Sequence, residues 1–315
     1  MAKGNDKPAQ KQVINAESLF LQYDSGENAL TKALLHVLAA GGEDMLKYLS
    51  EELDLEISFP LLEYSTQKRL DTKDARGNDR HIIYDGRIAP SNFELIIESK
   101  IVQNAINDDQ LERQFNFLLD QVQKGYSTKL VYITPDSHYP EKLKVEKYGD
   151  SIKWTSWKKV LDTLESYSTG SEVFETLLEG LQGIYQNLLA DTINVENRVL
   201  ILAGSYAEPI ALEKGYYNCQ IGRKFKDAGY LAFYYGKAIR NLFKITKPPF
   251  SNENEYPEIE KGATVMELKL VETLDQPIEN NKKKGDKTVA FTQGSPRYCS
   301  LEQFKNARYT SDLEN

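Results

Sequence analysis

The chain has few of the residues that form disulfides or bind soft metals. Its 315 residues include two cysteines, Cys219 and Cys299, and three histidines. The cysteines lie far apart and outside any Cys-x-x-Cys pattern, which argues against both a disulfide framework and a zinc site. We expect both cysteines to be core residues.

Long apolar segments are also missing. No stretch approaches the ~18 consecutive apolar residues of a membrane-spanning helix. The first residues, MAKGNDKPAQKQ, are polar and lack a hydrophobic signal region. We therefore expect a cytoplasmic protein without a membrane partner. The sequence has no Gly-rich phosphate loop and no dinucleotide fingerprint, so it gives no support for ATP-driven chemistry.

The most informative segment is residues 84–101, YDGRIAPSNFELIIESKI. From Phe93 onward two largely apolar sets of side chains alternate, which predicts a buried strand. Glu98 and Lys100 then share a face, where two opposite charges need partners to be buried. An apolar run precedes Asp85 and turn residues follow it, so a hairpin would place Asp85 beside Glu98.

Two carboxylates and a lysine at a sheet edge suit metal-assisted hydrolysis of phosphodiesters. Mg²⁺ is usually held by one or two carboxylates together with water and substrate phosphate. The ion acidifies a water molecule, and a nearby ammonium can orient that water or stabilise the transition state. The alternative is a structural ion pair between Glu98 and Lys100, because the spacing alone is a loose pattern.

One helix is expected before this strand in the sequence and one after it, since apolar residues recur at helical spacing in two segments. The first stripe is Leu30, Ala33, Leu34, Val37 and Leu38, and the second is Leu111, Phe115, Leu118, Leu119 and Val122, after a start at Asn107. A short strand from Lys129 should end at Pro135. Residues 151–161 predict an edge strand that runs into a helix, in which Trp154 and Trp157 are packing residues.

The order of these elements, with Asp85, Glu98 and Lys100 in place, resembles the PD-(D/E)XK nuclease superfamily over residues 20–165. The resemblance implies an α/β fold with a restriction-endonuclease-like αβββαβ core. It also implies that Asp85 and Glu98 bind Mg²⁺, with Mn²⁺ as a substitute, that the Ser99 backbone carbonyl is a further metal ligand, and that Lys100 is catalytic. Tyr84 stands where the family name has proline.

Two flanking features extend the resemblance. Many of these nucleases carry a glutamate on the first helix that completes the metal site, and Glu27 matches it. The alternative is a helix cap, because Asp24 and Glu27 have capping-box spacing. Several branches have a Gln-Leu-x-x-Tyr motif in the second helix, where this chain has Gln110-Leu-Glu-Arg-Gln114. The resemblance therefore gives Gln110 an active-site role and makes Gln114 a second candidate, although the tyrosine is missing and a glutamine at a helix rim can simply be solvated.

The charge distribution allows two interpretations. A net charge of −8 argues mildly against binding to nucleic acid, but local charge matters more than the sum. Basic residues gather in two groups: Lys68, Arg69, Lys73, Arg76, Arg80 and Arg87, then Lys142, Lys144, Lys147, Lys153, Lys158 and Lys159. Acidic residues are interspersed, so the groups form either a phosphate-binding surface or an ordinary solvated one.

The sequence changes character at about residue 190. We predict a nuclease-like domain over residues 13–190 and a β-rich barrel or sandwich over 191–315, which serves as a specificity or sensor domain. Strands are expected at 199–202, 230–235, 238–245 and 264–271, with turns at 247–249, 251–254 and 279–285. Basic and aromatic residues that could bind nucleic acid, or pack in the core, are Arg223, Lys224, Lys226, Tyr234, Tyr235 and Lys237.

The expected function is a metal-dependent endonuclease that acts on nucleic acid, with DNA favoured. The resemblance implies a role in prokaryotic defence or restriction. A homo-oligomer is compatible with this function, as is a small-molecule or protein signal at the C-terminal domain. The alternative belongs to another class: a catalytically silent nuclease-like protein that binds nucleic acid or senses a ligand.

Overall fold

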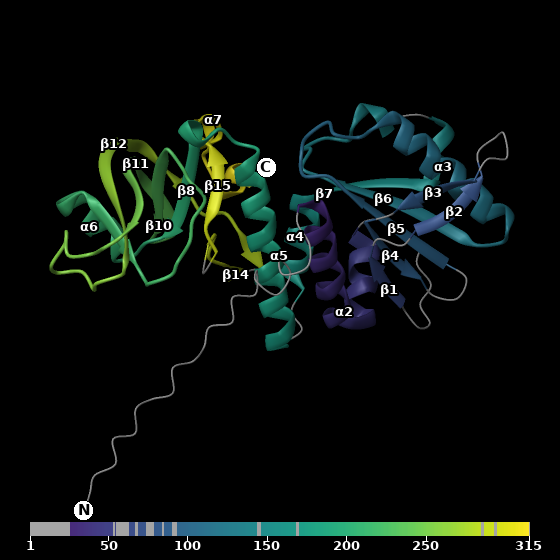
Figure 1. The fold of residues 1–315 in the computed structure, drawn as a ribbon, viewed down its shortest axis with the longest axis horizontal. Coiled ribbons are helices and arrows are strands. Elements are labelled where there is room, and N and C mark those ends of the chain that lie inside the picture. Colours follow the sequence, from purple (N-terminus) through teal and green to yellow (C-terminus); the bar gives the residue numbers. More distant parts are fainter. Residues whose placement is uncertain are drawn as a thin grey trace, which may run out of the picture.

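The computed structural model describes residues 26–52, 54, 63–66, 69–73, 79–83, 85–89, 93–143, 146–167, 170–284, 287–292 and 295–314. Several residues considered above lie outside this part of the chain: Asp24, Lys68, Arg76, Tyr84 and Lys144. Figure 1 shows two parts, each with its own sheet. The N-terminal part extends from α2 to α5, and the C-terminal part from β8 to the end of the described chain.

The N-terminal part is built on a five-stranded mixed sheet. Its strands lie in the order β1 (Glu63–Thr66), β4 (Gly86–Ala89), β5 (Phe93–Ser99), β6 (Ser127–Thr134) and β7 (Ile152–Ser156). The first three are antiparallel, and β5, β6 and β7 are parallel. A separate hairpin pairs β2 (Arg69–Lys73) with β3 (Asp79–Ile83).

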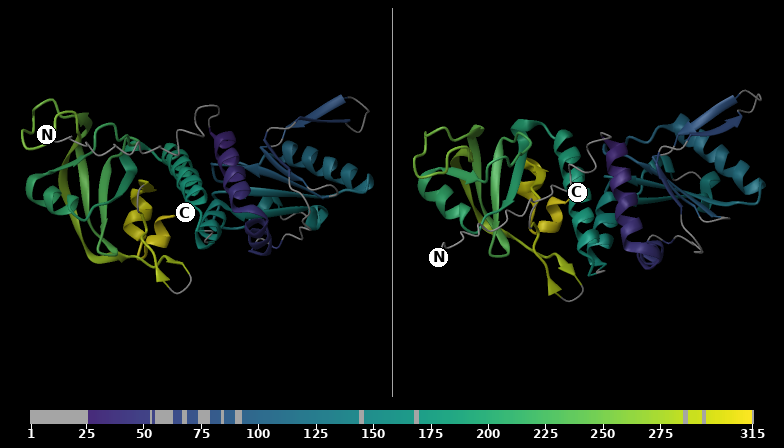
Figure 2. Two further views of the ribbon diagram at one scale, coloured as in Figure 1. Left: turned by 90° about the horizontal axis from the view of Figure 1, so that it is seen from below. Right: turned by 60° about the horizontal axis from the view of Figure 1, so that its bottom comes forward.

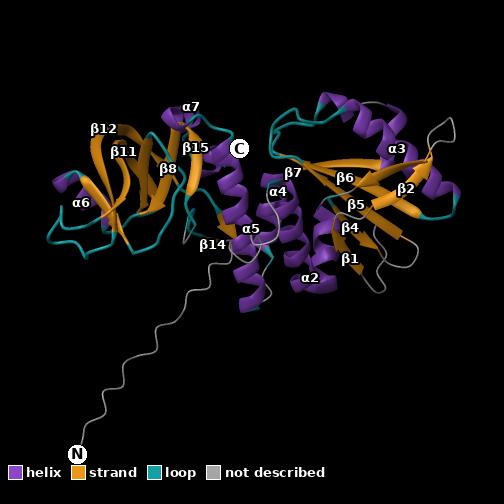
Figure 3. Ribbon diagram, viewed as in Figure 1, coloured by secondary structure: helices purple, strands orange, loops and turns teal. Residues whose placement is uncertain are grey.

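Helices cover both faces of this sheet (Figure 3). They are α2 (Glu27–Glu52), α3 (Asp108–Gln123), α4 (Trp157–Ser166) and α5 (Glu172–Asp191), with short turns η1 (Glu141–Leu143) and η2 (Glu146–Ser151). One core cluster joins α2, α4 and α5 to Leu95 and Ile97 of β5. A second cluster joins α3 to Ile96 on the opposite face of the same strand. The alternation predicted for β5 is therefore confirmed.

The C-terminal part contains one six-stranded sheet in the order β15-β8-β10-β11-β12-β9. Its elements are η3 (Val195–Asn197), β8 (Arg198–Ala203), α6 (Ala207–Lys214), β9 (Tyr216–Cys219), β10 (Tyr230–Tyr235), β11 (Ala238–Ser251), β12 (Thr264–Glu279), β13 (Lys283–Lys284), β14 (Lys287–Thr288), β15 (Arg297–Ser300), α7 (Leu301–Asn306) and η4 (Thr310–Leu313). All four predicted strands are present. The described residues of the C-terminal part form one open six-stranded sheet and a small β13–β14 hairpin, whereas a barrel or sandwich was expected.

The turn predicted at residues 247–249 is wrong, because β11 continues through Pro248 and Pro249 to Ser251. Proline cannot donate to a sheet ladder, so it is tolerated where a strand is unpaired on one side or has a bulge. Both conditions hold here. Strand β10 pairs with β11 only as far as Lys244, and the β11–β12 register shifts between Lys247 and Phe250.

Two predictions in the N-terminal part also need correction. The strand that pairs with β5 follows Asp85 rather than preceding it, because Gly86–Ala89 is β4 and the earlier run 79–83 pairs with β2. In α3, Leu111, Phe115 and Leu118 are buried as predicted, but Leu119 and Val122 are exposed. Gln114 and Phe117 are buried in their place, so the buried face of α3 includes a polar residue.

Helix α5 lies between the two parts (Figures 1 and 2). It packs against α2 on the N-terminal side and against β15 on the C-terminal side. Its buried Gln186 accepts a hydrogen bond from the backbone N–H of Tyr298 at 3.0 Å. The cysteines are both free, with Cys299 in the core and Cys219 half-buried. No helix within the described ranges is long and apolar enough to cross a membrane.

Candidate functional site

Asp85 and Ser99 are joined where β4 and β5 pair. The register sets Gly86 opposite Ile97, so Asp85 lies close to the end of β5. The backbone N–H of Ser99 donates to Asp85 Oδ2 at 2.9 Å, and the Ser99 hydroxyl lies 3.4 Å from the same oxygen. The β4–β5 hairpin therefore brings Asp85 to the Glu98-Ser99-Lys100 segment. The approach of Asp85 to this segment was predicted, but through a different hairpin.

Glu98 and Lys100 form a close ion pair on the face of the sheet that α3 covers. Lys100 Nζ donates to Glu98 Oε1 at 2.5 Å. Glu98 is 1% exposed, and a buried carboxylate is stable only when several donors surround it. The ion pair between Glu98 and Lys100, which the sequence analysis gave as the structural alternative, thus exists, but it is one contact in a larger cluster.

Two glutamines of α3 supply the remaining donors to Glu98. Asn107 caps the helix by accepting from the backbone N–H of Gln110 at 3.0 Å. Gln110 Nε2 donates to Glu98 Oε1 at 2.7 Å, and Gln114 Nε2 donates to Glu98 Oε2 at 2.9 Å. Gln110 is therefore placed at the site as predicted, and the second candidate, Gln114, contacts the same carboxylate.

Tyr132 is a member of this cluster that the sequence did not reveal. It lies directly opposite Glu98 in the parallel β5–β6 register, and its hydroxyl donates to Gln114 Oε1 at 2.5 Å. Burial and the negative charge of Glu98 raise the pKa of Tyr132, so the phenol remains a proton donor. In α3, Gln114 stands where the Gln-Leu-x-x-Tyr motif has its tyrosine, and Tyr132 from the neighbouring strand β6 contacts this glutamine. Alternation along β6 could have placed it on the Glu98 face.

Glu27, the first residue of α2, contacts the same segment from the other side. Its Oε1 accepts from the backbone N–H of Ile101 at 3.1 Å, and its Oε2 lies 3.6 Å from Lys100 Nζ. Thr31, one turn later, shares a 2.6 Å hydrogen bond with the Ser99 hydroxyl. The capping alternative depends on Asp24, which lies outside the described residues.

The cluster concentrates negative charge in a partly buried place. Burial and the nearby Glu98 raise the pKa of Asp85 to about 7, against the lowering effects of the Ser99 N–H and Lys100. Burial lowers the pKa of Lys100, but the carboxylates of Glu98, Glu27 and Asp85 raise it by more, so the net pKa lies above its ordinary value. This lysine is therefore an ammonium at neutral pH. An additional cation would relieve the repulsion among the carboxylates.

The donor set suits a hard divalent cation. Carboxylate oxygens and a backbone carbonyl are the ligands that Mg²⁺ takes, and Mg²⁺ keeps several waters rather than requiring a complete protein cage. In the described part of the chain, no three His, Cys, Asp or Glu side chains are close enough to form a preassembled metal cluster. Asp85, Glu98, the Ser99 carbonyl and Glu27 would thus act with water and substrate oxygens.

Trp157 packs against the site and holds the backbone at Lys100. Its indole N–H donates to the Lys100 carbonyl at 3.1 Å, and its side chain is fully buried against Tyr185. Trp154 is partly buried beside the α3 core and donates to Thr134 at 2.9 Å. Both tryptophans are packing residues, as predicted.

The basic groups seen in the sequence are largely paired where they are described. Lys142 lies 3.3 Å from Asp108, Lys153 lies 3.1 Å from Asp150, and Lys159 lies 2.7 Å from Glu52. This pairing favours the solvated-surface interpretation for the second group.

The basic and aromatic residues of the C-terminal part do not form one patch. Arg223 to Lys226 precede β10 in the chain, whereas Tyr235 is its last residue and Lys237 follows it; the two ends of β10 are ~17 Å apart at the usual rise per residue. Tyr234 is buried against Phe291, and Lys226 pairs with Asp191.

Comparison of the chain with protein-family models, with curated proteins and with solved structures found no match in any of the three.

Proposed function

We propose that this protein is a Mg²⁺-dependent endonuclease with a restriction-endonuclease-like core, which hydrolyses phosphodiester bonds of nucleic acid, with DNA favoured. The observation that carries the proposal is the convergence of Asp85, Glu98, Lys100 and Glu27, from three separate segments, on the end of β5. The same fold is supported by the order α2, β1, β4, β5, α3, β6 that remains when the separate β2–β3 hairpin, inserted between β1 and β4, is set aside.

In this proposal each residue has a defined part. Asp85, Glu98, the Ser99 carbonyl and Glu27 hold the metal ion. When bound, Mg²⁺ supplies a more acidic water and neutralises charge on the phosphate. Lys100 holds a proton and a positive charge at the site, so it can orient the nucleophile or stabilise the developing negative charge. Gln110 and Gln114 fix the orientation of the Glu98 carboxylate.

A purely structural cluster is a weaker explanation of the same contacts. Placing Glu98 at 1% exposure beside two other carboxylates costs free energy that an apolar residue at this position would not. A functional requirement accounts for this arrangement.

The test is incubation of the purified full-length protein with plasmid DNA, linear DNA and RNA, in parallel with Mg²⁺, Mn²⁺ or EDTA. We expect cleavage of at least one substrate with either metal and none in EDTA. Binding of nucleic acid without cleavage under every metal condition would instead identify the silent, nuclease-like alternative. A plasmid nicked but never linearised would identify single-strand cutting.

A further inference from the structure

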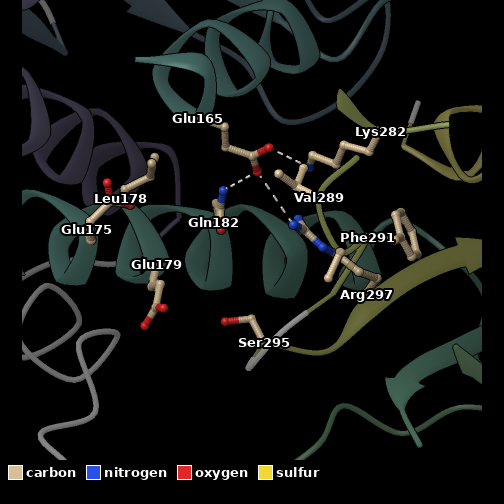
Figure 4. Close-up of a pocket in the computed structure, with 11 residues that line it drawn as sticks. Glu165, Glu175, Leu178, Glu179, Gln182, Lys282, Val289, Phe291, Ser295 and Arg297 are labelled. Carbon is tan, nitrogen blue, oxygen red and sulfur yellow. Dashed lines mark hydrogen bonds and ion pairs between the residues drawn. The ribbon is translucent and has the colours of Figure 1, made fainter. Parts of the chain in front are cut away.

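A cavity of about 160 Å³ lies between the two parts of the chain (Figure 4). Helices α4 and α5 form one side, and the segment around the β13–β14 hairpin with β15 forms the other. The polar residues that matter here are Glu165 and Gln182 from the helices, and Lys282 and Arg297 from the C-terminal part. A molecule bound in this cavity would contact both parts at once.

Arg297 is the unusual residue of this cavity. It is 7% exposed, and its Nε has no hydrogen-bond partner among the described residues. Its nearest acidic contact, Glu165 Oε1, lies 3.7 Å from a terminal nitrogen, which is an ion pair but too long for a hydrogen bond. A guanidinium has five donors, and buried donors normally have acceptors. Within the described part of the chain, the Nε of this arginine therefore lacks an acceptor.

Glu165 does not accept a hydrogen bond from Arg297 in this arrangement, because its nearer oxygen lies 3.7 Å away and its two oxygens are held by other groups. Lys282 Nζ lies 2.5 Å from Glu165 Oε2, and the amide of Gln182 donates to Oε1, the oxygen nearest Arg297. Figure 4 shows these groups around the Glu165 carboxylate, with the Arg297 guanidinium pointing toward it. The described residues of this network thus supply no hydrogen-bond acceptor to the Arg297 Nε, and a molecule bound in the cavity would supply one.

The surroundings define the kind of molecule that fits. A second cavity of about 250 Å³ adjoins the first through Glu165, Lys282 and Val289, and it adds the basic Lys158 and Lys283 and the acidic Asp162 and Glu314. Together the two cavities fall in the lower part of the ~300–1,000 Å³ range of a typical small-molecule site. Glu175 and Glu179 line the far end of the first cavity, where they would repel a highly charged polyanion.

We propose that this cavity binds a small organic molecule through a single oxyanion, a carboxylate or a phosphate monoester, which the Nε and a terminal nitrogen of Arg297 hold together. Guanidinium groups bind both oxyanions through paired, charge-assisted hydrogen bonds. The proposal goes beyond the nuclease activity, and its binding test does not depend on that activity.

Isothermal titration calorimetry of the full-length protein in EDTA tests the proposal, with inorganic phosphate, AMP and succinate as probes. We expect saturable binding of at least one probe, weakened at least about tenfold in Arg297→Gln through loss of a charge-assisted pair. Arg240→Gln is the matched control, because Arg240 bonds to the Tyr235 carbonyl and lines neither cavity. Binding of phosphate and AMP identifies a phosphate ligand, and binding of succinate identifies a carboxylate ligand.

Two results would overturn the proposal: no saturable binding of any probe to the unsubstituted protein, or equal binding to Arg297→Gln. If Arg297→Gln unfolds, Arg297→Lys provides the same comparison, because lysine keeps the positive charge but cannot form the paired hydrogen bonds of a guanidinium. Unchanged affinity in that folded variant would also contradict the proposal.

Discussion

The hydrogen-bonded series Tyr132–Gln114–Glu98 gives a prediction that can be tested by stability alone. Tyr132 and Gln114 are both fully buried. The tyrosine hydroxyl fixes the amide so that its oxygen faces Tyr132 and its NH₂ group faces Glu98. Tyr132→Phe leaves the amide oxygen without a donor, which typically costs about 1–3 kcal/mol of unfolding free energy. Gln114→Met leaves a buried carboxylate oxygen short of one donor, and we expect a cost of similar or larger size.

A double-mutant cycle followed by urea denaturation measures whether the two residues act as one unit. Because the Tyr132 hydroxyl loses its acceptor in Gln114→Met, the effect of Tyr132→Phe should shrink in that background, giving a coupling energy above about 0.5 kcal/mol. Tyr185→Phe serves as the control, since Tyr185 is buried in the core cluster on the other face of the sheet. Additive costs, within the ~0.3–0.5 kcal/mol typical of independent sites, would refute the series as described.

Three further predictions concern the carboxylates and the lysine. Lys100→Ala should lower Mg²⁺-dependent cleavage by about 10²-fold or more while nucleic acid is still bound; normal cleavage would remove Lys100 from the reaction. Glu27→Gln should raise the Mg²⁺ concentration needed for half-maximal cleavage with little change in melting temperature, whereas a capping role predicts normal cleavage and a lower melting temperature only in Glu27→Ala. The pKa of Asp85 is raised to about 7 in the folded protein, so metal-free protein should lose stability as pH rises from about 4 through 7. In EDTA, Asp85→Asn should therefore gain stability relative to the unsubstituted protein between pH 5 and pH 8, and a difference that is the same at both pH values would contradict the assigned shift.

The local pattern of the sequence predicted β5 and the approach of Asp85 to Glu98, but it did not predict β4, the strand that brings Asp85 there. Alternation from Phe93 to Ser99 places Glu98 and Lys100 on one face, because side chains of a strand have a period of two. Helical spacing likewise predicts the buried stripe of α2, all of which lies in the core. Asp85 reaches Ser99 because β4 pairs with β5, and Gln110 reaches Glu98 from the first turn of α3.

The features that the sequence did not predict depend on contacts between distant segments. Tyr132 reaches Glu98 only because β5 and β6 pair in a particular parallel register, and strand register is a tertiary property. The exposed Leu119 and Val122 show the same limit, since their apolar character suits burial but the packing of α3 on the sheet decides it. Arg297 and Glu165 approach each other only through the contact between the two parts.

The central claim is that the Glu98 cluster is a catalytic metal site, and the initial rate of Mg²⁺-dependent plasmid cleavage tests it most directly. Glu98→Gln should reduce that rate by about 10²–10³-fold, since it removes a charge that acts in the transition state. Glu94→Gln is the control: Glu94 lies on the same face of β5, is buried, and pairs with Arg87 instead of the cluster. We predict that Glu94→Gln cleaves within a few-fold of the unsubstituted protein, and cleavage by Glu98→Gln at the same rate as Glu94→Gln would contradict the claim.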